Sequence, residues 1–218
     1  MSLKLETHRG IPTNPNPTHE ESFKVVKNRR GQFTLSLPRI DDKKRLAGYP
    51  GLTGWSKTLS ELIPKSKFYV EPFSGMAKVY QELDKSKVQY VILNDKAKPL
   101  VKVLKKLFPE TNVTNTDYTH CIKKYDTPET FFLIDIPWYE NYYAQGFSAF
   151  TEKNINVYNS KVLNLCDSIQ GKFIITSKDK KIFRDSKFTN HTIKGDYPIC
   201  GNFPELLITT NLSLEELN

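Results

Sequence analysis

The chain has few cysteines and histidines, and none of them is spaced to act together. Cys121, Cys166 and Cys200 are far apart, no Cys-x-x-Cys pair occurs, and the four histidines do not cluster. Zinc sites and disulfide frameworks depend on such spacings, so we expect no metal site and no disulfide framework. The scarcity of cysteine fits a reducing, intracellular setting.

Long apolar runs are also missing. No stretch approaches the roughly 18 apolar residues that mark a membrane-spanning helix. The first ten residues, MSLKLETHRG, contain no apolar region of the kind that signal peptides carry. We therefore expect a cytoplasmic protein with no membrane partner.

The glycine-rich phosphate-binding patterns are absent as well. Neither GxGxxG nor GxxxxGK[ST] occurs, although both patterns cradle the phosphates of bound nucleotides. A site for an adenosine-containing ligand without phosphates therefore fits the sequence better than a nucleoside phosphate site.

What the chain has is an ordinary globular composition with an excess of positive charge. It contains 218 residues, 26% charged and 38% hydrophobic, with a net charge of +8 and a pI of about 9.2. This length suits one sizeable domain or a domain with a small appendage. The charge favours an anionic partner such as nucleic acid.

The N-terminal region differs from the rest. Residues 1–20 are polar and rich in proline and asparagine, which is typical of a poorly ordered arm. Residues 23–45 alternate apolar and polar side chains between basic flanks, which predicts a short hairpin or edge segment. We expect a partly flexible, basic arm over residues 1–45 and a single domain over residues 46–218.

From residue 49 onward, strand and helix patterns alternate. The expected strands are 67–71, 88–93, 112–117, 131–135, 172–177 and 205–211. The expected helices are 56–63, 76–83, 97–108 and 159–169. Near-continuous apolar strands separated by helix-length segments predict an α/β fold with a mostly parallel sheet flanked by helices.

Acidic side chains end four successive predicted strands: Glu71, Asp95, Asp117 and Asp135. The carboxyl ends of parallel strands meet at one edge, where open α/β sheets bind their ligands. Asp95 is placed to accept from ribose hydroxyls, and Asp117 from an adenine amino group. A single acid at a strand end often caps a helix or forms a turn, and this alternative stays open for Asp95 and Asp117.

The stretch FFLIDIPWY over residues 131–139 is the most informative motif. Four apolar residues predict a buried strand, followed by Asp135, Ile136, Pro137 and Trp138. A carboxylate beside an aromatic plane suits a flat, amino-bearing ring, because the carboxylate accepts a hydrogen from the amino group while the aromatic side chain stacks. The alternative is a strand followed by an ordinary proline turn.

Two further segments are candidates for ligand contact. Small residues after the first strand of the domain, in Glu71–Ala77, let the backbone approach a ligand closely at the start of a helix. Lys57 follows a glycine- and aromatic-containing loop and is a candidate partner for a ligand carboxylate, with a solvated lysine as the alternative.

A basic segment lies near the C-terminus. Between residues 178 and 203, cations alternate with aromatic side chains, a pattern that suits contacts with a nucleic-acid backbone. The expected nucleic-acid-binding residues are Lys178, Lys180, Lys181, Arg184 and Lys187. A solvated charged hairpin is the alternative.

Together these motifs resemble the Dam-like family of adenine-specific DNA methyltransferases, which are class I enzymes that use S-adenosylmethionine. The resemblance runs from about residue 48 to residue 211. It rests on segments similar to the family's motifs, in the same order: YPG…K (49–57), YVEPFSG (69–75), LND (93–95), NTDY (115–118), DIPW (135–138), GKFIITS (171–177) and PELLITTN (204–211).

The resemblance implies a Rossmann-like class I methyltransferase fold and assigns roles to residues. The residues expected to contact the cofactor are Tyr49, Gly51, Lys57, Glu71, Phe73, Ser74, Gly75, Asp95, Asp117 and Tyr118. Catalysis falls on the DIPW motif. The Asp135 carboxylate and the Ile136 carbonyl would each accept one hydrogen of the adenine amino group, and Trp138 would stack on the flipped-out base. No metal is implied.

Three departures from the family pattern leave other functions open. Ile136 replaces the first proline of DPPY, Trp138 replaces its tyrosine, and Met76 stands where the cofactor loop usually has a small residue that would not crowd the cofactor. An RNA adenine methyltransferase, a catalytically inactive nucleic-acid-binding relative and a small-molecule methyltransferase are the alternatives.

Overall fold

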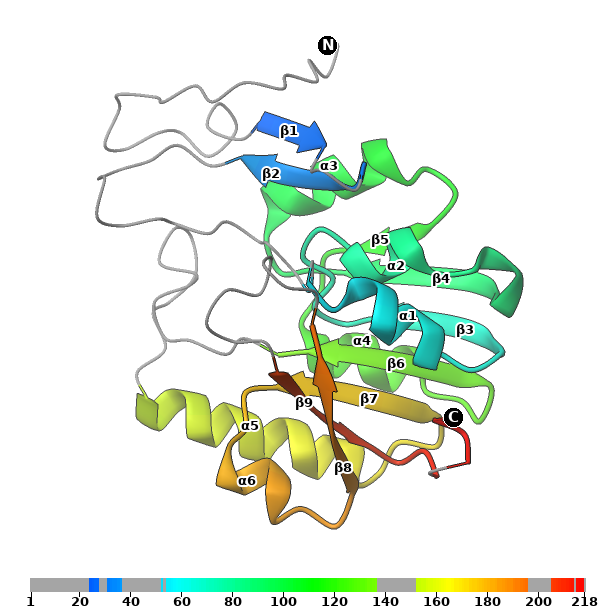
Figure 1. Ribbon diagram of the computed structural model, residues 1–218. Coiled ribbons are helices and arrows are strands. Elements are labelled where there is room, and N and C mark those ends of the chain that lie inside the picture. Colours follow the sequence, from blue (N-terminus) through cyan, green and yellow to red (C-terminus); the bar gives the residue numbers. More distant parts are fainter. Residues whose placement is uncertain are drawn as a thin grey trace.

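A computed structural model describes residues 24–27, 31–36, 52, 54–136, 152–195, 205–213 and 215–217. Its centre is a seven-stranded sheet in the order β5-β4-β3-β6-β7-β9-β8 (Figure 1). The strands are β3 (Ser66–Glu71), β4 (Val88–Asn94), β5 (Asn112–Thr114), β6 (Thr130–Asp135), β7 (Lys172–Ser177), β8 (Thr189–Lys194) and β9 (Glu205–Thr210).

Neighbouring strands from β5 to β7 are parallel, and β9 runs antiparallel to both β7 and β8. The connecting helices are α1 (Ser56–Leu62), α2 (Lys78–Glu82), the 3-10 turn η1 (Lys85–Lys87), α3 (Lys98–Leu107), α4 (Tyr118–Tyr125), α5 (Glu152–Cys166) and α6 (Lys181–Arg184). The expected α/β, Rossmann-like fold with a mostly parallel sheet flanked by helices is confirmed.

The two faces of the sheet carry separate apolar cores. One core contains Leu59 of α1, Val79 of α2 and Leu104 of α3, so these helices cover one face. The other contains Ile122 of α4 and Val162 of α5, which cover the opposite face. Along β6, alternate side chains enter alternate cores, which is why the strand reads as a continuous apolar run. Each such buried side chain contributes roughly 1.5–3 kcal/mol.

Most expected elements are present, with some displaced boundaries. The helix expected over 76–83 begins at Lys78, because Ala77 has a φ of 50° and a left-handed backbone. The strand expected over 112–117 ends at Thr114, because the Asn94 side chain bonds the backbone N–H and carbonyl of Thr116. The helix expected over 159–169 begins at Glu152 and ends at Cys166.

Four of the described elements were not expected from the sequence: η1, α4, α6 and the edge strand β8. β8 is mostly polar, as the sequence TNHTIK indicates, with Ile193 packed against the core, and its position at the edge of the sheet needs no continuous apolar run. Part of the predicted charged hairpin is therefore a strand of the main sheet.

The N-terminal hairpin that the alternation predicted is present. β1 (Lys24–Lys27) pairs antiparallel with β2 (Phe33–Ser36). Polar side chains fix it to α2: the Lys78 ammonium donates to the Phe33 carbonyl, and Gln81 both accepts from the Phe33 N–H (2.7 Å) and donates to its carbonyl (3.1 Å). Burial lowers the pKa of Lys78 to about 8. The hairpin is thus bonded to the helix that follows the predicted cofactor loop.

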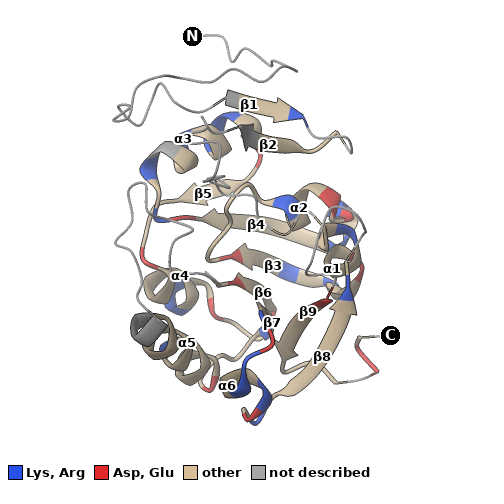
Figure 2. Ribbon diagram, turned by 60° about the vertical axis from the view of Figure 1, so that its left-hand side comes forward, with Lys and Arg blue, Asp and Glu red and all other residues tan. Residues whose placement is uncertain are grey.

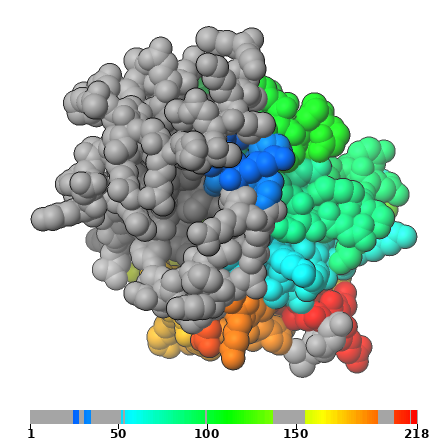
Figure 3. Space-filling model, turned by 45° about the horizontal axis from the view of Figure 1, so that its top comes forward, coloured from blue at the N-terminus to red at the C-terminus, as the bar shows by residue number. Residues whose placement is uncertain are grey.

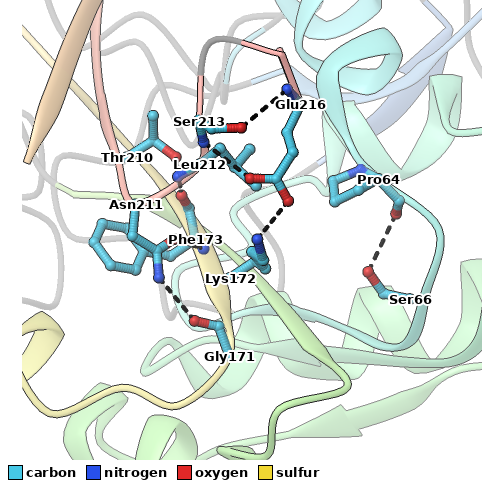
Figure 4. Close-up of polar contacts among 10 residues, drawn as sticks. All are labelled: Pro64, Ser66, Gly171, Lys172, Phe173, Thr210, Asn211, Leu212, Ser213 and Glu216. Atoms are coloured by element: carbon cyan, nitrogen blue, oxygen red, sulfur yellow. Dashed lines mark hydrogen bonds and ion pairs between the residues drawn. The ribbon is translucent and has the colours of Figure 1, made fainter.

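The motif segments GKFIITS and PELLITTN meet at the amino end of β7 (Figure 4). The Asn211 side chain accepts from the Phe173 N–H (2.9 Å) and donates to the Gly171 carbonyl (2.9 Å). A Cβ at Gly171 would lie 2.5 Å from the Thr130 carbonyl oxygen, so this position requires glycine. These residues lie at the opposite end of β7 from Ser177 and join strands.

Within the described part of the chain, no helix is long and apolar enough to cross a membrane.

Candidate functional site

The site lies where the direction of winding changes. From β3 the chain proceeds outward through β4 and β5, whereas β6 and β7 lie on the other side of β3. β3 and β6 are therefore neighbours, and the strands that follow them in the chain lie on opposite sides of this pair. In open α/β sheets, ligands bind outside the carboxyl ends of strands at such a point. Glu71 and Asp135, the last residues of these two strands, lie at this position.

The loop after β3 is held against the end of β4. The Ser74 N–H donates to the Asn94 carbonyl (2.8 Å), and the Gly75 N–H donates to the Asp95 carboxylate (3.1 Å). Gly75 has a φ of 50°, a conformation that glycine adopts without strain. The predicted cofactor loop is thus fixed by two backbone contacts to its neighbouring strand.

Asp95 takes one of the roles that its position suggested. Its second oxygen accepts from the Ala97 N–H (2.9 Å), which makes it the turn former before α3. Burial raises the pKa of Asp95 to about 6, and the backbone N–H bonds oppose that increase. The turn-forming alternative is confirmed, and contact with ribose hydroxyls stays a prediction.

Asn94 is a structural centre of the site that the sequence did not identify as such. Its side chain donates to the carbonyls of Pro72 (2.9 Å) and Thr116 (3.0 Å), and accepts from the Thr114 hydroxyl (2.8 Å). It also accepts from the Thr116 N–H and hydroxyl, both at 3.0 Å. One buried amide therefore joins the ends of β3, β4 and β5.

Glu71 is turned into the protein. It is buried, and a single carboxylate oxygen accepts from the Tyr69 hydroxyl (2.6 Å) and the Tyr80 N–H (3.1 Å). Burial raises the pKa of Glu71 to about 8, opposed mainly by these two bonds, and nearby Asp135 adds to the increase. In this structure Glu71 anchors α2 to β3, and its predicted contact with a cofactor stays a prediction.

Asp117 and Tyr118 begin α4. The Asp117 carboxylate accepts from the Thr119 N–H (2.9 Å) and hydroxyl (2.7 Å), so the helix-cap alternative is confirmed. Tyr118 belongs to an aromatic cluster with Phe73, 5.0 Å away between ring centres, and Tyr158 of α5, 5.1 Å away. The structure thus brings together Phe73 and Tyr118, two of the predicted cofactor residues.

Tyr158 was not predicted. It lies in a helix whose start was expected at residue 159, so its place on the core-facing side of that helix was not apparent. The i, i+4 spacing of Tyr158 with Val162 is the signal that a longer helix would have revealed.

Asp135 is held by a neighbouring strand. Thr176 lies opposite it in the register of β6 and β7, and the Thr176 hydroxyl donates to the Asp135 carboxylate (2.7 Å). Loss of hydration raises the pKa of Asp135 to about 7, opposed by that hydrogen bond. The Ile136 side chain is buried in the core, which fixes the end of the strand. Pro137 and Trp138 lie outside the described residues.

Unpaired hydroxyl groups remain close to these strand ends. Ser74, in the loop after β3, and Ser177, the last residue of β7, have buried hydroxyl oxygens with no hydrogen-bond partner among the described residues. Buried polar groups are nearly always paired, so such atoms call for an explanation. At a ligand-binding edge, one explanation is that the ligand supplies the missing hydrogen-bond partner.

The remaining predicted cofactor residues differ in their placement. Lys57 is exposed in the first turn of α1. Tyr49 and Gly51 lie outside the described residues. Met76 is fully buried in the same core as Val79, so its side chain is withdrawn from the exposed part of the loop and the expected crowding does not follow.

The predicted nucleic-acid-binding segment is partly neutralised by its own acids. Arg184 pairs with Asp179, Lys181 with Asp185, and Lys187 with Asp167. Lys178 and Lys180 are partly exposed. Exposed ion pairs of this kind add little stability, but they reduce the positive charge available to a phosphate. A nucleic-acid contact here stays a prediction.

No group of three histidine, cysteine or acidic side chains in the described ranges is arranged to hold a metal ion.

Comparison with known proteins finds only distant structural similarities. No protein-family model and no curated protein matches it. Similar solved structures include an rRNA methylase from Streptococcus thermophilus, with 11% identity, a TM-score of 0.43, and coverage of 71% of this chain and 92% of that one. Another is a methyltransferase from Geobacter sulfurreducens, with 11% identity, a TM-score of 0.48, and coverage of 74% and 78%.

A spermidine synthase from Thermotoga maritima is similar to the same degree, with 12% identity, a TM-score of 0.48, and coverage of 90% of this chain and 72% of that one. Because these structures are described by different activities, they do not select a function. Only the residues of the site bear on the function of this protein.

Proposed function

We propose that this protein transfers a methyl group from S-adenosylmethionine to the exocyclic amino group of adenine in DNA. The observation that carries the proposal is the position of Asp135. It lies at the switch point of the sheet, fixed by Thr176, beside the strand whose glycine loop is tied to Asp95. The family resemblance of the DIPW, EPFSG and LND segments supports the same assignment.

The residues at the edge fit S-adenosylmethionine. Gly75 presents a backbone with no side chain in the way, and the buried Ser74 hydroxyl has no partner among the described residues. Phe73 and Tyr118 offer aromatic surface for an adenine ring. When bound, S-adenosylmethionine supplies a methyl group activated by its sulfonium sulfur.

Asp135 would make the adenine amino group a better acceptor of the methyl group. The lone pair of an adenine amino group is delocalised into the ring, so the nitrogen is a poor nucleophile. Hydrogen bonds from its two hydrogens to the Asp135 carboxylate and the Ile136 carbonyl would localise that lone pair on nitrogen. Bound S-adenosylmethionine would supply the methyl group to that nitrogen and leave as its thioether, and the amino proton released would leave by way of one of these two acceptors. Orientation and electrostatic complementarity supply the rate acceleration.

The aromatic residue of the motif has a separate task. A target adenine in a duplex must leave the base stack, which costs a few kcal/mol. Stacking on Trp138 would return roughly 1–3 kcal/mol, so it is comparable in size with that cost.

RNA is the second candidate substrate. The DIPW motif resembles the DPPW motif of RNA adenine methyltransferases, and tryptophan at position 138 favours this alternative. The chemistry at Asp135 would be the same for both polymers.

The test combines cofactor binding with transfer. Calorimetry should detect S-adenosylmethionine binding, and radiolabelled methyl groups should enter adenine-containing DNA, with Asp135→Ala as the control. Label in RNA but not in DNA would select the second candidate. Cofactor binding without transfer to either polymer would contradict both, and loss of cofactor binding as well would favour an inactive nucleic-acid-binding relative.

A further inference from the structure

Helix α3 carries the most one-sided charge of any described helix. Its ten residues, KPLVKVLKKL, include four lysines and no acid. Lys98, Lys102, Lys105 and Lys106 are all exposed, while Leu100 and Leu104 face the core. Positions 98, 102 and 105–106 repeat with the period of an α-helix, so these lysines form one stripe, which we call the α3 lysine stripe.

The α3 lysine stripe differs from the cationic segment near α6. No described carboxylate forms an ion pair with Lys98, Lys105 or Lys106, whereas Lys181 and Arg184 of α6 are each paired with an aspartate. Figure 2 shows α3 with basic residues only, and the region of α6 with basic and acidic residues together. Positive charge is therefore more available on α3.

The stripe begins at the site. The Ala97 N–H at the start of α3 donates to Asp95, whose other oxygen accepts from Gly75 of the loop. Because α3 follows β4, it runs from the carboxyl edge back along the sheet. At 1.5 Å per residue, the stripe extends from the site for roughly 12 Å between Lys98 and Lys106.

The N-terminal hairpin extends the same surface. Phe33 of β2 packs edge-on against Phe108, just after α3, with ring centres 6.4 Å apart. Lys27 of β1 is exposed, and its ammonium lies 5.3 Å from the centre of the Phe33 ring. In Figure 3 the blue surface of the hairpin borders the green surface of the chain that includes α3.

We propose that the α3 lysine stripe binds the sugar-phosphate backbone of the DNA strand flanking the target adenine. The inference rests on the proposed function, because it takes DNA as the substrate. Lysine stripes on soluble proteins are often only solvated, but Lys98, Lys105 and Lys106 form no ion pair with a described carboxylate, and the stripe is continuous with the site. It supplies affinity and register, while the DIPW motif selects the base.

The test compares two variants with the same change in charge. One is Lys98→Gln, Lys105→Gln and Lys106→Gln on α3. The matched control is Lys65→Gln, Lys123→Gln and Lys161→Gln, three exposed lysines on other elements. Binding of a fluorescent DNA duplex is measured by anisotropy at several salt concentrations, with thermal unfolding as the check on folding.

The α3 variant should bind DNA about tenfold more weakly or worse at low salt, with a salt dependence reduced by roughly two to three phosphate contacts, and the control should keep that of the parent. Replacement of the same three α3 lysines by arginine should restore binding. Equal losses in both glutamine variants would mean that net charge alone acts, and would overturn the inference.

Two further results would also overturn it: no DNA binding by the parent protein, or a stripe that matters for RNA and not for DNA. S-adenosylmethionine binding and methyl transfer by the parent are measured in parallel. If transfer to DNA occurs while the α3 variant binds DNA normally, only this inference fails. If no transfer occurs, the proposed function fails on its own measurement.

Discussion

The two halves of the carboxyl edge differ in how far their polar side chains are already paired. On the β3–β5 half, Glu71 accepts two hydrogen bonds and Asn94 bonds the ends of three strands, while the Ser74 hydroxyl has no described partner. On the β6–β7 half, Asp135 accepts one side-chain hydrogen bond within the described part of the chain, from Thr176, and the Ser177 hydroxyl has no described partner. Glu71 and Asn94 thus carry more hydrogen bonds within the protein than Asp135 does.

This contrast predicts different kinds of failure. Substitutions on the β3–β5 half should lower stability and, through the loop, cofactor affinity. Substitutions on the β6–β7 half should lower the rate of transfer at a nearly constant stability.

The largest effect is expected at Asp135. Asp135→Asn keeps the size of the side chain but removes the negative charge that accepts the amino hydrogen. The transfer rate should fall by about 10²–10³-fold, as for the loss of one preorganised hydrogen-bonding group in an active site. Single-turnover kinetics at saturating cofactor would measure this, with calorimetry showing cofactor affinity within a few-fold of the parent.

A rate within twofold of the parent would remove Asp135 from the mechanism. A parallel collapse of stability would instead mean that the two halves of the edge do not differ.

Asn94→Ala should produce the opposite pattern. It leaves the carbonyls of Pro72 and Thr116 without their donor, so we expect a loss of about 2–4 kcal/mol in the free energy of unfolding. Cofactor affinity should fall with it, because the loop loses an anchor. Urea denaturation measures the first effect and calorimetry the second. A stable variant with normal affinity would show that the loop does not depend on this amide.

Variants of Glu71 distinguish a structural role of this acid from a role in ligand binding. Glu71→Gln keeps the oxygen that accepts from Tyr69 and Tyr80, so stability and cofactor affinity should change little. Glu71→Ala should cost roughly 1–3 kcal/mol of stability. A marked loss of cofactor affinity in the glutamine variant alone would restore the predicted contact between Glu71 and the cofactor.

The stability of the parent protein and of Glu71→Gln should also depend differently on pH. Since the pKa of Glu71 is raised from 4.5 to about 8, the folded protein holds a proton that the unfolded chain releases. This group therefore makes stability fall as the pH rises from about 4.5 towards 8. Glu71→Gln should flatten that part of the curve, measured by denaturation across this range. An unchanged slope would contradict a buried, protonated Glu71.

Among the substitutions expected to lower the transfer rate directly, Thr176→Val should have the smaller effect, and the pH dependence of the rate reveals it. The carboxylate form of Asp135 is the acceptor, so the transfer rate should rise as the pH passes about 7. Thr176→Val removes a bond that lowers the pKa of Asp135, so the midpoint should move to higher pH, with a rate loss of about tenfold or less at neutral pH. Thr176→Ser should restore the parental profile. A lower rate with an unmoved midpoint would make Thr176 a packing residue only.

The sequence alone predicted the sheet well, and it predicted which acidic residues end its strands at the carboxyl edge. Apolar runs such as Phe131–Ile134 specify buried parallel strands, and an acid directly after such a run must lie at the carboxyl edge. That reasoning placed Asp135 and Asp95 correctly, because it depends only on where a strand ends.

The hydrogen-bond partners of each polar side chain could not be predicted from the sequence in the same way. Asn94 follows a strand whether it binds a ligand or ties loops together, and the difference lies in Thr114 and Thr116, twenty or more residues away. The cations at 181 and 184 looked available because their pairing with Asp185 and Asp179 depends on the local fold.

The central claim is that Asp135 directs methylation to the amino nitrogen of adenine. The most direct measurement is to digest DNA to nucleosides after a single turnover and to locate the transferred methyl group by mass spectrometry. The account predicts N6-methyladenine from the parent protein and none above background from Asp135→Ala. Methylation of another base, or N6-methyladenine in equal yield from both proteins, would contradict it.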